Sequence, residues 1–109
     1  MKELIFNRRD YKNYKDMYKD LAIKLERIDG IEDYYNISNY DYDPNCLYED
    51  MMFGLDNSLN YKFTFVNFDK EKIDLQKTYD DYEYSIIIKI FEEFVKKYPN
   101  NSLEFKTSI

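Results

Sequence analysis

The chemistry open to this chain is limited first by the side chains that it lacks. Its 109 residues include no His, and Cys46 is the single Cys. Without His, the commonest general base and metal ligand is missing, together with every Ser–His or Cys–His arrangement. Two isolated Gly residues, Gly30 and Gly54, cannot build a phosphate-binding loop. We therefore expect no enzyme activity and no cofactor.

One segment does place oxygen ligands at the spacing of a calcium loop. Positions 1, 3, 5 and 9 of such a loop would be Asp41, Asp43, Asn45 and Glu49. Position 6, where the sharp turn needs Gly, would be Cys46, and position 12, where a bidentate Glu is needed, would be Met52. Because the turn residue and the strongest ligand are both absent, the sequence predicts no metal site.

Negative charge and phenol rings are concentrated in residues 32–60. The chain has a net charge of −6, and this window holds seven Asp or Glu, five Tyr and no Lys or Arg. Unpaired like charges oppose compaction unless a partner supplies cations, and Tyr is a typical interface anchor. The window therefore predicts a surface for a basic protein partner. The residues expected to bind it are Glu32, Asp33, Tyr34, Tyr35, Asp41, Tyr42, Asp43, Tyr48, Glu49 and Asp50.

A simpler interpretation of the window stays open: its tyrosines could be core residues and its acids a solvated surface. A second acidic and aromatic cluster lies at residues 79–84. The negative charge disfavours direct binding to nucleic acid or to an anionic membrane. No apolar run approaches the ~20 residues of a membrane span, and the apolar start of the chain is too short for a signal peptide. With a single Cys, these features predict a cytoplasmic protein.

The elements that must position the window alternate between strands and helices. Apolar runs and alternating patterns predict strands at 2–7, 61–68 and 102–109, and apolar residues at helical spacing predict helices at 10–30 and 80–98. Residues 73–79 fit a hairpin strand, a loop or a short helix equally well. We expect one domain over residues 1–109, α/β or α+β, with a three- to four-stranded, at least partly parallel sheet packed against about three helices.

A further helix should begin inside the acidic window. Asp43 is a good N-cap, Pro44 suits the first helical position, and Gly54 can end the helix. Leu47, Met51 and Leu55 follow at intervals of four residues and should face the core. Tyr48, Glu49 and Met52 should then point elsewhere.

This order of elements resembles the barstar family of intracellular ribonuclease inhibitors, which includes many immunity proteins. In that family a Tyr-Tyr-Gly leads into a helix whose acids plug the nuclease active site. Here Tyr34 and Tyr35 precede the second helix, with Asn36 in the place of Gly, and Glu49 and Asp50 lie on that helix. The resemblance implies a three-stranded parallel sheet and inhibition of a nuclease.

The sequence thus favours an acidic, stoichiometric inhibitor of the immunity or antitoxin type. It would bind a basic nucleic-acid-handling enzyme, such as a toxin nuclease, and occlude its substrate cleft. Two alternatives stay open. The first is a phage-encoded anti-defence protein that mimics nucleic acid, as anti-CRISPR proteins do. The second is a non-catalytic adaptor or self-associating domain, for which we expect an exposed apolar surface that includes Met52 and Phe53.

Overall fold

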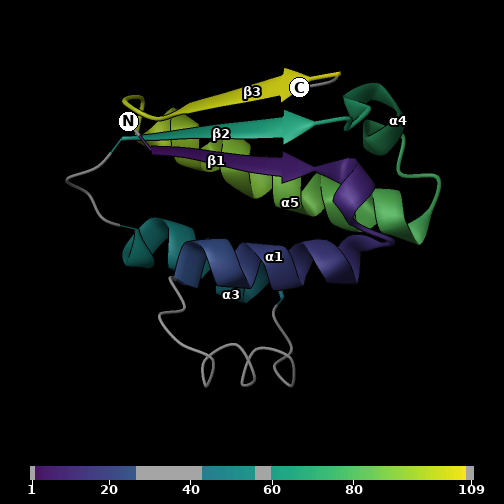
Figure 1. The fold of residues 1–109 in the computed structure, drawn as a ribbon, viewed down its shortest axis with the longest axis horizontal. Helices are drawn as coiled ribbons and strands as arrows, with labels where there is room; N and C mark the ends of the chain where they lie inside the picture. Colours follow the sequence, from purple (N-terminus) through teal and green to yellow (C-terminus); the bar gives the residue numbers. More distant parts are fainter. Residues whose placement is uncertain (1, 27–42, 56–59, 108–109) are drawn as a thin grey trace.

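A computed structural model describes residues 2–26, 43–55 and 60–107, and these residues form a parallel sheet of three strands. The strands are β1 (Lys2–Asn7), β2 (Tyr61–Val66) and β3 (Ser102–Lys106), and β2 lies at the centre. In register, Phe6 pairs with Phe65, and Phe65 pairs with Phe105. The predicted α/β class, with a small parallel sheet, is confirmed (Figure 1).

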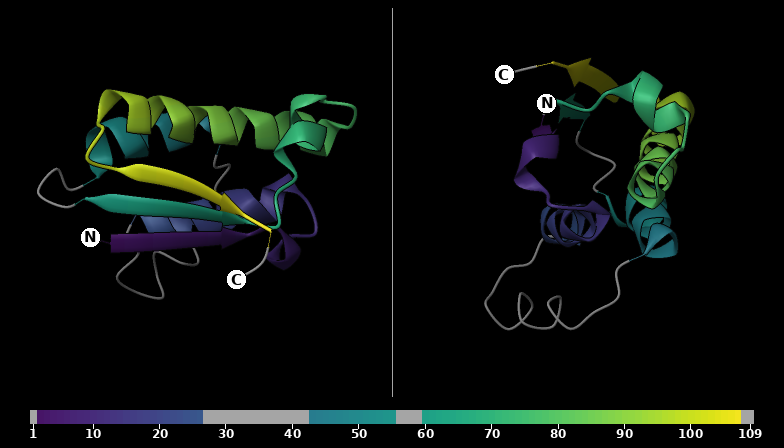
Figure 2. Two further views of the ribbon diagram at one scale, coloured as in Figure 1. Left: turned by 90° about the horizontal axis from the view of Figure 1, so that it is seen from above. Right: turned by 90° about the vertical axis from the view of Figure 1, so that its right-hand side faces the viewer.

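Three helices lie on one face of this sheet, as the two views of Figure 2 show. They are α1 (Tyr14–Glu26), α3 (Pro44–Glu49) and α5 (Tyr79–Lys97). A 3-10 turn, η1 (Arg8–Asp10), follows β1, and α3 continues into a π-helical turn, η2 (Asp50–Gly54). Helix α3 packs beside α5, and η2 packs beside α1.

Several predicted boundaries move for local reasons. The first helix begins at Tyr14 because the side chain of Asn13 accepts a hydrogen bond from the Lys15 N–H at 2.9 Å, which is an N-cap contact. Its predicted end at Gly30 lies outside the described residues. The central strand ends at Val66 because Asn67 has a φ of 63°, a left-handed conformation that Asn tolerates better than most residues.

The segment after the central strand is a short helix, α4 (Lys70–Asp74). The hairpin strand considered for residues 73–79 is therefore wrong: Ile73 and Asp74 end α4, residues 75–78 form a turn, and Tyr79 begins α5. Asp69 caps this helix, since its Oδ1 accepts a hydrogen bond from the Lys72 N–H at 3.2 Å. Ile73 is buried, whereas Leu75 and Tyr79 are exposed, so the alternating pattern did not mark one face of a strand.

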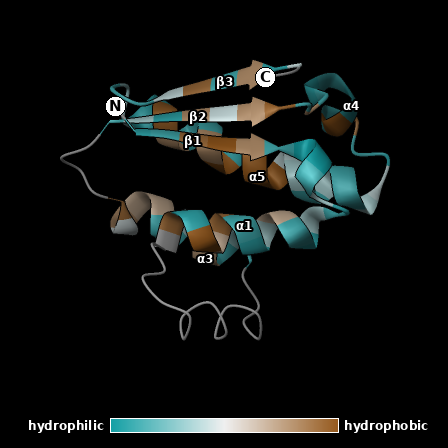
Figure 3. Ribbon diagram, viewed as in Figure 1, coloured by the Kyte–Doolittle hydropathy of each residue, from teal (hydrophilic) through white to brown (hydrophobic). Residues whose placement is uncertain are grey.

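The core is an aromatic cluster between the sheet and α5. The ring of Phe91 contacts Phe63 at 4.9 Å and Phe65 at 5.0 Å, measured between ring centroids. Phe6 adds edge-on contacts to Phe65 and Phe91. Each such pair stabilises the fold by about 0.5–1.5 kcal/mol beyond the burial of its area. In Figure 3 the hydrophobic residues of α5 accordingly lie beneath the strands.

The other face of the sheet carries a row of charged side chains. Lys62 in the central strand lies between two carboxylates, with its Nζ 3.6 Å from Glu3 Oε2 and 3.2 Å from Glu104 Oε2. Hydrogen bonding to Glu104, together with the charges of both carboxylates, raises the pKa of Lys62. Parallel sheets are usually covered on both faces. No helix of the described residues covers this second face, and its charged side chains make it compatible with water.

Candidate functional site

The start of α3 is fixed by local contacts within the acidic window. The Oδ1 of Asp43 accepts a hydrogen bond from the Cys46 N–H at 2.9 Å, and Pro44 occupies the first turn. That hydrogen bond from the Cys46 backbone lowers the pKa of Asp43 and keeps its carboxylate charged. The predicted N-cap is therefore confirmed, and the exposed side chain of Asp43 carries a negative charge at the N-terminus of the helix.

The rest of the helix is amphipathic. Leu47, Met51 and Leu55 are buried in the core, as predicted from their spacing. Glu49 is exposed, Tyr48 is 41% exposed, and Phe53 is 82% exposed. We call Tyr48, Glu49 and Phe53 the outer face of α3–η2. The half-buried Asp50 borders it, and Met52 packs partly against the core, contrary to the prediction that it points elsewhere.

The structure describes four of the ten predicted binding residues. Asp43, Tyr48, Glu49 and Asp50 all come from one helix, α3–η2, and its N-cap. The other six lie outside the described residues and stay predictions: Glu32, Asp33, Tyr34, Tyr35, Asp41 and Tyr42.

A tyrosine cluster lies where α1 meets α5. The Tyr18 hydroxyl on α1 donates a hydrogen bond to Glu83 Oε2 on α5 at 3.0 Å, and both residues are buried. The ring of Tyr14 contacts Tyr18 and Tyr79 edge-on, with centroid distances of 6.0 Å and 5.4 Å. A hydrogen bond to Glu83 also raises the pKa of Tyr79. Two exposed rings extend this cluster outward, since Tyr79 is 64% and Tyr82 is 44% exposed.

The two acidic segments of the sequence meet at Tyr18. Burial raises the pKa of Tyr18 most, the carboxylate of Glu83 raises it further, and the negative charge of Asp43 adds to both. Asp43 therefore lies near enough to Tyr18 to act on it, although the two residues belong to different helical elements. The N-cap of α3 therefore lies near the tyrosine cluster of α1 and α5.

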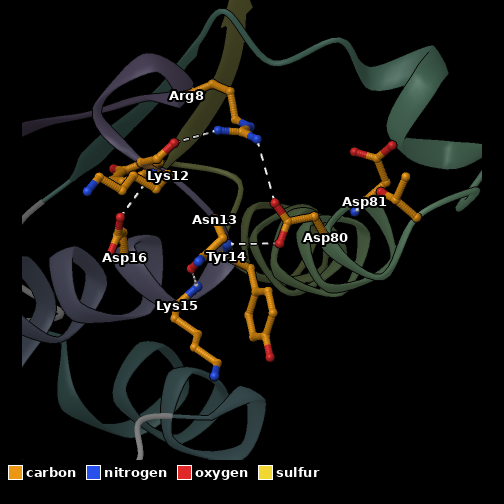
Figure 4. A network of polar contacts seen from close by, with 10 residues as sticks. Arg8, Lys12, Asn13, Tyr14, Lys15, Asp16, Asp80 and Asp81 are labelled. Carbon is orange, nitrogen blue, oxygen red and sulfur yellow. Dashed lines mark hydrogen bonds and ion pairs between the residues drawn. The ribbon is translucent and has the colours of Figure 1, made fainter.

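The carboxylates of the cluster at residues 79–84 are used inside the protein. Figure 4 shows Asp80 accepting a hydrogen bond from the Tyr14 N–H at 3.2 Å, with its Oδ2 3.7 Å from Arg8 Nη2. Asp81 and Glu83 are both buried. Asp80 and Glu83 therefore hold α5 against the start of α1 and against Tyr18, while Tyr79 and Tyr82 are the exposed side chains of this cluster.

Phe53 was expected at an exposed surface only under the adaptor alternative, and the contribution of α1 was not predicted. One local signal could have indicated Phe53, since it lies four residues after Glu49, on the side of the helix opposite the predicted core positions. No local signal could join Tyr14 and Tyr18 to residues 79–83, because these contacts span 65 residues of chain in the case of Tyr18 and Glu83.

The described residues hold no group of three or more His, Cys, Asp or Glu arranged to bind a metal ion. Among the same residues, no helix is long and apolar enough to cross a membrane. The sequence matches no protein-family model and no curated protein.

Proposed function

We propose that this chain is a stoichiometric protein inhibitor of a basic nucleic-acid-handling enzyme, most simply a toxin nuclease. One observation carries the proposal. The helix that buries Leu47 and Met51 exposes Tyr48 and Glu49, within a window that contains no Lys or Arg. Such a surface combines rigid rings with uncompensated negative charge, and its natural complement is a cationic cleft.

Acids elsewhere in the described residues form ion pairs with Lys or Arg, unlike Asp43 and Glu49. Arg8 pairs with Asp80, Lys24 with Asp20, and Lys70 with Asp74 and Glu92. Within the described residues, Asp43 and Glu49 take part in no such pair. Their charges are therefore available to attract cations of a partner and to speed its association.

The mechanism needs no turnover. Binding would place Tyr48 and the carboxylates of Glu49 and Asp50 in the positions that phosphates and bases of the substrate would take. The resemblance to the barstar family supports this view, since the protein has the three-stranded parallel sheet that the resemblance implies. A single Cys suits a reducing compartment, so we place the inhibitor and its target enzyme in the cytoplasm.

The test compares two variants with the same change in charge. Glu49→Lys with Asp50→Lys reverses one charge on the outer face and one at its border, while Asp10→Lys with Glu71→Lys reverses exposed acids on η1 and α4. Proteins retained by the wild-type chain from extracts of its own cells are identified at low and high salt by mass spectrometry. The association rate of the retained enzyme is then measured with each variant.

We expect the retained protein to be a basic nuclease. Its association should slow by at least about tenfold with the first variant and much less with the second, and it should slow steeply as salt is raised. Retention that is insensitive to salt and equal for both variants would contradict the proposal. A phage anti-defence protein would use the same face, and the neighbouring genes would distinguish it: a toxin gene favours immunity, and phage genes favour anti-defence.

A second candidate function, an adaptor or self-associating domain, is favoured by the exposure of Phe53. An aromatic side chain that is 82% exposed is the apolar feature which that function requires. Light scattering over a range of concentrations distinguishes it from the inhibitor. A dimer that forms with concentration and disappears in Phe53→Ala would support self-association, and a monomer at every concentration would support the inhibitor.

A further inference from the structure

Phe53 is the most exposed large hydrophobic side chain of the described residues, at 82%. Single exposed apolar residues are common and need no explanation by themselves. The setting of Phe53 distinguishes it, since Leu47, Met51 and Leu55 of the same segment are buried. Its ring projects on the side of the helix that carries charge and faces away from the core.

The backbone at Phe53 is also unusual. Residues Asp50–Gly54 form a π-helical turn, which is rare and occurs frequently at functional sites. Within this turn Met51 stays in the core while Phe53, two residues later, stays in solvent. The turn continues directly from α3, so Phe53 is held on a regular element rather than on a loose loop.

The neighbours of Phe53 on this element are acidic. Glu49 precedes it by four residues, about one helical turn, and Asp50 by three, at the start of the π-helical turn. An aromatic ring flanked by two carboxylates has the same features as an unpaired base flanked by two phosphates. Clefts for single-stranded nucleic acid combine Lys and Arg with aromatic side chains on which such bases stack.

We propose that Phe53 is an anchor that enters the base-stacking pocket of the inhibited enzyme, while Glu49 and Asp50 meet the cations that normally hold phosphates. This inference rests on the proposed inhibitor function and deepens it. It assigns the target enzyme to those that act on single-stranded nucleic acid. Enzymes that bind duplexes contact phosphates and groove edges while the bases stay stacked inside. Such enzymes therefore need no base-stacking pocket that could accept this ring.

A second copy of this chain is a poorer occupant of the face. A symmetric dimer built on Phe53 would bring Glu49 and Asp50 of one copy towards the same residues of the other. Like charges placed opposite each other across an interface are unfavourable. A cationic partner removes this repulsion, which is why charge complementarity selects the enzyme and not the dimer.

The experiment measures inhibition of nuclease activity in the basic protein fraction of extracts from the cells that make this chain. Two probes are used, a fluorogenic single-stranded oligonucleotide and a fluorogenic duplex of the same sequence. The wild-type chain is titrated beside Phe53→Ala, Phe53→Tyr and Phe53→Leu. Leu75→Ala is the control, because Leu75 is 63% exposed beside α4, at the other end of the molecule in Figure 1.

We expect the wild type to inhibit cleavage of the single-stranded probe. For Phe53→Ala and Phe53→Leu, the protein concentration that gives half inhibition should rise by at least about tenfold, because the stacking ring is lost. Phe53→Tyr and Leu75→Ala should resemble the wild type. Because residue 53 is exposed, every variant should keep the unfolding midpoint of the wild type in urea.

The remaining outcomes separate the two proposals. Inhibition that is unchanged in Phe53→Ala, or fully kept by Phe53→Leu, overturns the stacking anchor and leaves the inhibitor function standing. Inhibition of duplex cleavage alone overturns the assignment to single-stranded substrates. No inhibition of either probe by the wild type overturns the proposed function, and the anchor with it.

Discussion

The hydroxyl of Tyr18 on α1 donates a hydrogen bond to the buried carboxylate of Glu83 on α5, at 3.0 Å. These two residues join the first and last helices of the fold beside the start of α3. A carboxylate at this depth is costly unless hydrogen bonds replace its lost water. The contact therefore holds together the two helices, α1 and α5, against which η2 and α3 pack.

Removal of this hydroxyl should destabilise the protein. Tyr18→Phe leaves the Glu83 carboxylate buried without its partner from α1, and we expect the free energy of unfolding to fall by about 1–3 kcal/mol. The matched control is Tyr48→Phe, where the ring is exposed and the change should stay within about 0.5 kcal/mol. Urea unfolding followed by circular dichroism measures both. Equal losses in the two variants would show that the Tyr18–Glu83 contact contributes nothing specific.

Alkaline pH should unfold the protein through its buried tyrosines. Burial raises the pKa of Tyr84 to about 12, from 10.0, and burial with nearby carboxylates also raises the pKa of Tyr11 and Tyr18. The unfolded chain then loses its phenol protons at lower pH than the native chain. Stability is therefore complete below pH 10 and falls as pH rises towards the native pKa values, by up to ~1.4 kcal/mol per pH unit for each such tyrosine.

The slope of stability against pH, from urea unfolding at several values above about pH 9, checks this expectation. Tyr84→Phe removes one of the titrating groups and should reduce the slope. It should cost little near neutral pH, since the Tyr84 hydroxyl has no hydrogen-bond partner among the described residues. A slope that is the same in the variant would contradict the role given to Tyr84.

Asp80 should matter for stability rather than for binding. It accepts a hydrogen bond from the Tyr14 N–H at the start of α1 and lies 3.7 Å from the Arg8 guanidinium. Asp80→Ala loses both contacts, and we expect a loss of about 1–2 kcal/mol in urea unfolding. Asp74→Ala removes only an exposed pair with Lys70 and should change stability by less than about 0.5 kcal/mol. Similar effects at the two positions would argue against the capping role of Asp80.

Asp43 allows the cap of α3 to be separated from the charge of the site. Asp43→Ala removes the acceptor for the Cys46 N–H and should cost about 1 kcal/mol of stability. Asp43→Asn keeps an acceptor of equal capping strength and should stay near the wild type in urea, yet slow association with the basic enzyme. If Asp43→Asn binds as fast as the wild type, the charge of Asp43 plays no part in recognition.

Local patterns in the sequence are sufficient to predict α3–η2. Asp43, Pro44 and Gly54 set its limits, and Leu47 and Met51 set its buried side, because caps and helical spacing act over a few residues only. The same kind of signal is ambiguous after β2. A short apolar alternation at Ile73 and Leu75 fits strand or helix, and the nearby cap at Asp69 decides for the helix α4.

The sequence by itself determined the class of the fold, the limits of α3–η2 and the excess of negative charge in residues 32–60. Only the tertiary structure decided which charges and rings are available to a partner. Asp80 and Glu83 became internal contacts, while Glu49 and Phe53 remained on the surface. The reason is that availability depends on neighbours far along the chain. The partners of Asp80 and Glu83 lie 66 and 65 residues away, beyond the reach of any local pattern.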